Sequence, residues 1–140
     1  MKRTLRRAEG QTLIEFSLGI TVFLMLLIGT IDLGRGVFMF NGVSQAAREI
    51  ARETSVHPGT GSLGASTESL AVVDLQQAIV PGLGTPAFEC VDIAGTTITG
   101  SCQPGNWVRV TVSTEFHPAL PLLALMGPFD LSSTSSAEIQ

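Results

Sequence analysis

The chain has 140 residues, the length of a single domain, and 44% of them are hydrophobic while only 14% are charged, against about 25% charged residues in an ordinary soluble domain. This composition argues against a collagen-like, coiled-coil or low-complexity disordered chain. Four of the eight basic residues fall within the first seven positions, and all 12 acidic residues come later. A basic start on an acidic body argues against nucleic acid as a partner. It is typical of an N-terminus that stays at the cytoplasmic face of a membrane.

An apolar stretch follows the basic start. Residues 16–31 carry no charged side chain, and extension back to Gln11 gives 21 residues with one charge, Glu15. A helix of that length spans about 31 Å, close to the roughly 30 Å hydrocarbon core of a bilayer. We therefore predict that residues 11–31 cross a lipid bilayer once, with the N-terminus in the cytoplasm and the C-terminus outside.

Glu15 is the exception within this stretch. A carboxylate at the centre of a membrane helix costs about 2.5–3.5 kcal/mol on insertion scales, and less near an end. Either Glu15 lies near the membrane edge and reaches water, or it has a cationic partner. The surroundings favour a partner, because a basic stub and Gly10 precede Glu15 and the aromatic Phe16 directly follows it.

The string G-Q-T-L-I-E-F over residues 10–16 resembles the cleavage site of type IV prepilins, in particular those of the Flp, or tight-adherence (Tad), subfamily. The resemblance implies that prepilin peptidase, a membrane-embedded enzyme, cuts between Gly10 and Gln11. It also implies that Glu15 pairs with the new N-terminal amine of a neighbouring subunit. Phe16 stands where major pilins of this subfamily usually have tyrosine. Gln11 is not the usual methylated apolar residue, so its N-methylation stays open.

The likeness extends beyond the cleavage site. Residues 7–56, with I-D-L-G-R and N-G-V-S-Q-A-A-R-E, and residues 107–139, with W-V-R-V-T-V-S, are similar to the TadE-like minor pilins. This resemblance implies a non-enzymatic minor pilin or pseudopilin that is assembled into, or primes, a Tad/Flp-type pilus for adherence or secretion. The implied partners are prepilin peptidase, other pilin subunits and the inner-membrane assembly platform. The implied location is the cytoplasmic membrane and, after processing, an extracellular pilus.

Three alternatives are weighed against this function. The first is an uncleaved bitopic component of an envelope secretion or assembly complex, which would keep Met1. The second is a soluble binding module released by signal peptidase, but no A-x-A-like site follows Ile31. The third is an enzyme, for which the sequence has no phosphate-loop, dinucleotide, hydrolase or zinc-protease motif. We expect no catalytic residues and no cofactor.

The predicted helix continues beyond the membrane segment. No proline interrupts residues 11–57, and the helix is expected to end at His57, Pro58 and Gly59. Its second part, residues 32–56, is amphipathic, with a core-facing stripe made of Val37, Phe40, Ser44, Ala47, Ala51 and Thr54, flanked by Val43 and Ile50. Glycines in this part, among them Gly42, are expected to mark a bend or a close contact.

Residues 57–140 are predicted to form an extracytoplasmic head domain, while residues 1–10 form a basic leader peptide. We expect the fold class to be α+β, with the long helix packed on a small antiparallel sheet. The expected elements after the long helix are a loop over residues 59–66, a helix from the N-cap Ser66 to about Val80, and strands over 88–94, 107–116 and 131–139.

An apolar segment at residues 120–129 is too short to span a bilayer. It is expected either to cover the core as a lid or to expose an oligomerisation patch.

Cys90 and Cys102 both fall on the predicted outer side. An even cysteine count in an oxidising compartment favours a disulfide, and closing this 13-residue loop contributes roughly 3 kcal/mol in the chain-entropy model. The alternative is two buried thiols. The two histidines, His57 and His117, each precede proline without a nearby ligand pattern, so we expect no metal site.

Overall fold

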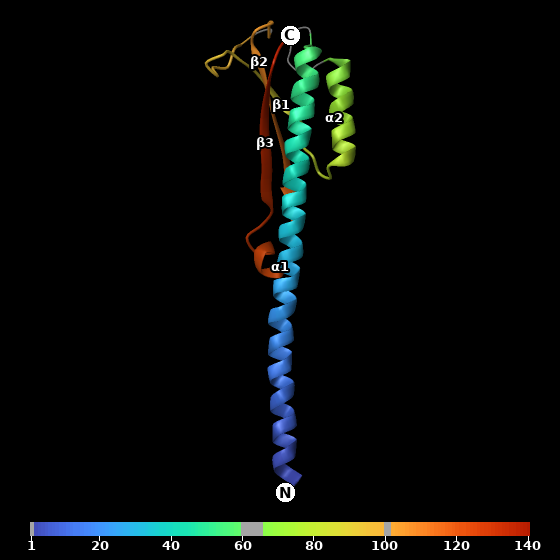
Figure 1. The fold of residues 1–140 in the computed structure, drawn as a ribbon, viewed down its shortest axis with the longest axis vertical. Coiled ribbons are helices and arrows are strands. Elements are labelled where there is room, and N and C mark those ends of the chain that lie inside the picture. The colour runs from blue at the N-terminus through green and yellow to red at the C-terminus, as the bar shows by residue number, and fades with distance from the viewer. Residues whose placement is uncertain (1, 60–65, 100–101) are drawn as a thin grey trace. The chain divides into compact units, whose positions relative to one another are not determined.

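The computed structural model describes residues 2–59, 66–99 and 102–140, so most of the loop expected over residues 59–66 lies outside the described residues. The fold is α+β, as predicted (Figure 1). Its elements are, in chain order, the helices α1 (Lys2–Val56) and α2 (Thr67–Ile79), the strands β1 (Ala87–Val91) and β2 (Trp107–Phe116), the short helix α3 (Pro121–Ala124) and the strand β3 (Phe129–Glu138).

The chain divides into two compact units. The helical unit comprises the chain up to Arg35 together with Pro118–Gly127. The sheet unit comprises Gly36–His117 together with Pro128–Gln140. Helix α1 runs from the first unit into the second without a break.

Helix α1 has 55 residues and therefore includes residues 2–10 of the predicted leader as well as the predicted span. It ends at Val56, where the sequence predicts a stop. The His57 amide still donates to the Glu53 carbonyl oxygen at 2.9 Å. Pro58 has no amide hydrogen and disfavours a helical residue before it, so the helix cannot continue.

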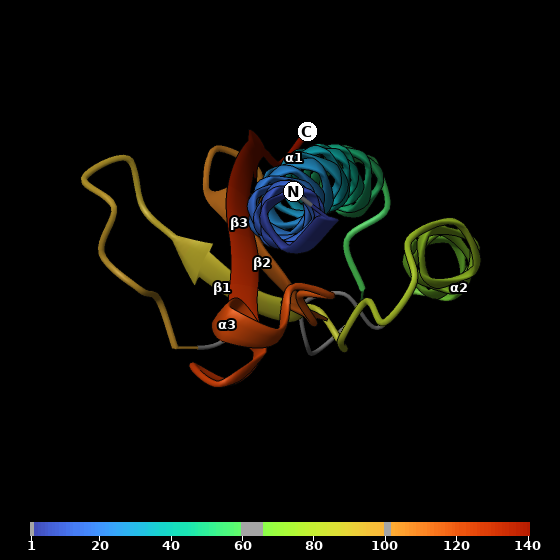
Figure 2. The ribbon, with the colours of Figure 1, turned by 90° about the horizontal axis from the view of Figure 1, so that it is seen from below.

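The sheet unit is built around β2. The strand order is β1-β2-β3 with both pairs antiparallel, so β2 lies in the middle. Val108, Val110 and Val112 of β2 are buried, as their alternation predicts, and belong to one hydrophobic cluster with Ile50 of α1 and Ile139. Figure 2 views α1 end-on and shows the strands on one side of it and α2 on the other.

The buried stripe of α1 differs from the predicted one. Val37 and Phe40 are exposed, so their assignment to the core is wrong. The stripe that packs in the cluster is made of Val43, Ala46, Ala47, Ile50 and Ala51, with Thr54 also buried. The predicted stripe is thus confirmed at Ala47, Ala51 and Thr54, and the two flanking positions, Val43 and Ile50, are fully buried. Helical spacing alone does not show how far along α1 the buried face extends.

Gly42 lies where a close approach requires a small residue. A Cβ atom at this position would lie 3.3 Å from Cγ2 of Val80. Val80 is the C-cap of α2, so the missing side chain lets the end of α2 pack against α1. The sequence predicts either a bend or a close contact at Gly42, and the structure shows the close contact.

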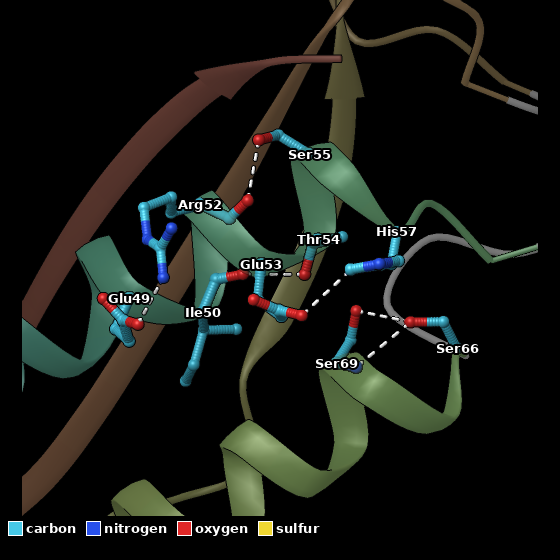
Figure 3. Close-up of polar contacts among 9 residues, drawn as sticks. All are labelled: Glu49, Ile50, Arg52, Glu53, Thr54, Ser55, His57, Ser66 and Ser69. Atoms are coloured by element: carbon cyan, nitrogen blue, oxygen red, sulfur yellow. Dashed lines mark hydrogen bonds and ion pairs between the residues drawn. The ribbon is translucent and has the colours of Figure 1, made fainter. Parts of the chain in front are cut away.

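Helix α2 begins as predicted. The Ser66 hydroxyl accepts a hydrogen bond from the Ser69 amide at 3.1 Å and so caps the first turn (Figure 3). The same figure shows the His57–Glu53 pair, with Nδ1 2.9 Å from Oε1, at the end of α1. Both contacts fix the ends of helices on either side of the undescribed residues.

The outer strands differ slightly from their predicted bounds. Strand β1 ends at Val91 because Asp92 turns the chain: its carboxylate accepts from the Thr96 amide at 2.8 Å. Strand β3 covers Phe129–Glu138 and not 131–139. Cys90 and Cys102 form the predicted disulfide, which ties β1 to the connection before β2.

Candidate functional site

The residues of the predicted processing and assembly site all lie on α1. Gly10, Gln11, Glu15 and Phe16 belong to one continuous helix, and the last three are exposed. A Cβ atom on Gly10 would meet no other atom within 4 Å. Glu15 Oε1 accepts a hydrogen bond from Gln11 Nε2 at 3.4 Å, one helical turn away. The structure thus places the predicted cut and the carboxylate on the same open stretch of helix.

Apolar side chains dominate the surface of this stretch, although Gln11, Glu15, Ser17 and Thr21 are also exposed on it. One helix among the described residues, Gly10–Val56, is long and apolar enough to cross a membrane, and its most apolar window has a mean hydropathy of 2.1. That window is not buried within the chain. Large exposed side chains point outward in every direction, among them Leu13, Ile14, Phe16, Leu18, Phe23, Met25 and Leu26. Such a surface needs lipid or other helices around it.

The hydroxyl groups of this stretch find partners within the helix. Ser17 donates to the Leu13 carbonyl oxygen at 2.7 Å, and Thr21 donates to that of Ser17 at 2.7 Å. Because each hydroxyl bonds to the preceding turn, neither requires water or a second molecule. The carboxylate of Glu15 is different, since its described partner is a neutral amide.

Asp32 is a site residue that sequence reasoning missed. Its side chain is buried, with 2% of the residue exposed. Oδ2 accepts a hydrogen bond from the Leu120 amide at 2.7 Å, and Oδ1 lies 3.3 Å from Nη1 of Arg35. A hydrogen bond from the Ala119 backbone has the largest effect on Asp32 and lowers its pKa. Burial raises this pKa, but hydrogen bonds from Leu120 and Arg35 and the charge of Arg35 lower it further, so that the net shift is downward. No sequence signal links Asp32 to residues almost 90 positions later.

This bond joins the apolar segment after β2 to α1. Pro118–Gly127 belongs to the helical unit and not to the sheet unit. Among the side chains that the structure describes, none from this segment belongs to the hydrophobic cluster. The two expectations for this segment, a lid over the core or an exposed oligomerisation patch, stay predictions. Asp32 anchors its first residues to α1.

Comparison with known proteins identifies the same part of α1. The model of the TadE-like protein family matches residues 10–52. The resemblance predicted from the sequence is thus confirmed over residues 10–52, which include the predicted cleavage motif, the apolar stretch and most of the amphipathic part of α1. No curated protein and no solved structure matches the chain. The TadE-like segment ends before α2, so it covers none of the sheet.

Proposed function

We propose that the chain is a non-enzymatic minor pilin or pseudopilin of the Tad/Flp type. It is made as a single-pass membrane precursor with residues 57–140 outside, and prepilin peptidase cuts it between Gly10 and Gln11. The mature subunit then enters a pilus, or primes its assembly, for adherence or secretion. The TadE-like match over residues 10–52 carries this proposal.

The placement of Glu15 supports an assembly role. Its side chain is exposed on an apolar helix, and its described partner, Gln11, carries no charge on its side chain. A carboxylate in hydrocarbon without a cation is costly, by about 2.5–3.5 kcal/mol at the helix centre. After cleavage, Gln11 bears a free ammonium group, which supplies that cation to a neighbouring subunit.

The first experiment determines the N-terminus by intact mass, in cells with and without prepilin peptidase. We expect a chain that begins at Gln11 only when the peptidase is present, and Gly10→Leu should prevent this processing. A chain that begins at Met1 in both strains would instead indicate an uncleaved component of an envelope complex. A chain that begins beyond Ile31 would indicate a secreted module and would reject the proposal.

The second experiment tests the role of the carboxylate. Glu15→Ala should be inserted into the membrane and processed normally, and should not appear in sheared pilus fractions. Glu115→Gln is the matched control, because it removes an exposed carboxylate on β2 and should assemble normally. Normal piliation with Glu15→Ala would refute the pairing role while leaving the processing result intact.

A further inference from the structure

The segment that Asp32 anchors has an unusual composition. Residues 118–128 read P-A-L-P-L-L-A-L-M-G-P and include no polar side chain. Leu125 is 85% exposed and Met126 is 72% exposed. Single exposed apolar side chains are common on protein surfaces, but a run without any polar residue indicates a surface that something covers.

The contacts of this segment place it along the last turns of the apolar helix. The Asp32 carboxylate, one position beyond the predicted span, holds the Leu120 amide at 2.7 Å. Leu120 also lines a hollow whose other walls come from α1, among them Met25, Ile28 and Leu33. Figure 1 draws α3 beside this part of α1. The segment therefore begins level with the end of the predicted span and lies against its side.

Several backbone amides of the segment already donate hydrogen bonds to acceptors within the chain, as apolar surroundings require. The carbonyl oxygen of Leu120 accepts from the amides of Leu123 and Ala124 at 3.0 and 2.9 Å. Further along, Met126 donates to the Leu123 oxygen at 3.0 Å and Gly127 to that of Ala124 at 3.2 Å. Proline at 118, 121 and 128 removes three more donors. Few backbone amides thus lose a water partner when the segment leaves water.

We propose that Pro118–Gly127 rests in the outer interfacial layer of the membrane that α1 spans, with Leu125 and Met126 against lipid. The proposal rests on the membrane span of the proposed function. Lipid is favoured over a second copy because the segment directly adjoins the lipid-facing surface of the same unit. Asp32 fixes this level within each chain, whether or not neighbours are present.

The test places a single tryptophan at Leu125. Trp107, the one tryptophan of the chain, is first replaced by phenylalanine; it is half-buried and lies outside the hydrophobic cluster. The full chain is reconstituted into phosphatidylglycerol and phosphatidylethanolamine vesicles whose acyl chains carry bromine near the headgroup. We expect Leu125→Trp to show blue-shifted emission and severalfold stronger quenching than Ile93→Trp, a control at a side chain that is 93% exposed in the sheet unit.

A third variant, Phe23→Trp, separates the two proposals. If Phe23→Trp is quenched by bromine placed deep in the acyl chains while Leu125→Trp behaves like Ile93→Trp, the span stands and the interfacial segment is refuted. If neither is quenched, the span itself fails. Blue-shifted emission of Leu125→Trp that bromine does not quench and that increases with protein density would show that a second copy covers the segment, which overturns the proposal. Met126→Trp repeats the measurement if Leu125→Trp misfolds.

Discussion

Truncation of Ile50 tests whether the packing of α1 on β2 holds the sheet unit together. Ile50 is 0% exposed and belongs to the cluster that contains Val108 and Val110. Ile50→Ala removes three carbon atoms worth about 0.8 kcal/mol each, and the cavity left behind adds to the loss. The higher helix propensity of alanine offsets at most about 0.7 kcal/mol of this loss in stability. We expect the free energy of unfolding to fall by about 3 kcal/mol.

The chain offers both a reporter and a matched control for this measurement. Trp107, at the start of β2, reports unfolding of the sheet unit in urea when the full chain is held in detergent micelles. Ile93→Ala makes the same chemical change at an exposed side chain and should alter stability by less than about 0.5 kcal/mol. A loss below about 1 kcal/mol for Ile50→Ala, or equal losses for the two variants, would refute the packing argument.

Two further predictions concern the disulfide and Asp32. Replacing Cys90 and Cys102 together by alanine should lower the free energy of unfolding by about 3 kcal/mol for this 13-residue loop, and a reductant should then have no further effect in the same urea assay. The lowered pKa of Asp32 means that its stabilisation is present above its ordinary value of 3.8 and is lost as pH falls through the lower folded value. Hydrogen exchange of the Leu120 amide, corrected for its intrinsic rate, should therefore accelerate below that pH, and at neutral pH in Asp32→Ala but not in Asp74→Ala. Unchanged protection in Asp32→Ala would show that the carboxylate does not hold this amide.

Features with local causes could be predicted from the sequence. The alternation in Trp107–Phe116 determines both the bounds and the buried face of β2, because side-chain direction in a strand has a period of two. Ser66 predicts the start of α2, since a hydroxyl satisfies amides within the first turn that have no other partner. Pro58 predicts the end of α1 for a similar reason.

Features decided by distant contacts could not be predicted. How far the buried stripe extends along α1 depends on where the sheet packs, and the helical spacing continues through Val37 and Phe40 beyond the packed part. The apolar segment after β2 is equally suited to a core or to a membrane by composition. The structure joins it to α1 through a hydrogen bond between Asp32 and Leu120, and neither residue carries a local signal for that contact.

The two acidic residues at the ends of the apolar stretch show why the proposed assembly needs more than one subunit. Asp32 receives backbone amides and a guanidinium group from its own chain, so its charge is compensated internally. Among the residues that the structure describes, Glu15 accepts a hydrogen bond from the side-chain amide of Gln11, which lies on the same helix one turn away. In the mature chain that we propose, the new ammonium of Gln11 and the carboxylate of Glu15 are separated by four residue rises, about 6 Å along the axis. A neighbouring subunit shifted by about that distance brings its ammonium level with Glu15, where each charge compensates the other in hydrocarbon. In the proposed assembly, this pair selects the axial offset between adjacent helices, because exposed apolar side chains are spread along α1 and do not specify one offset.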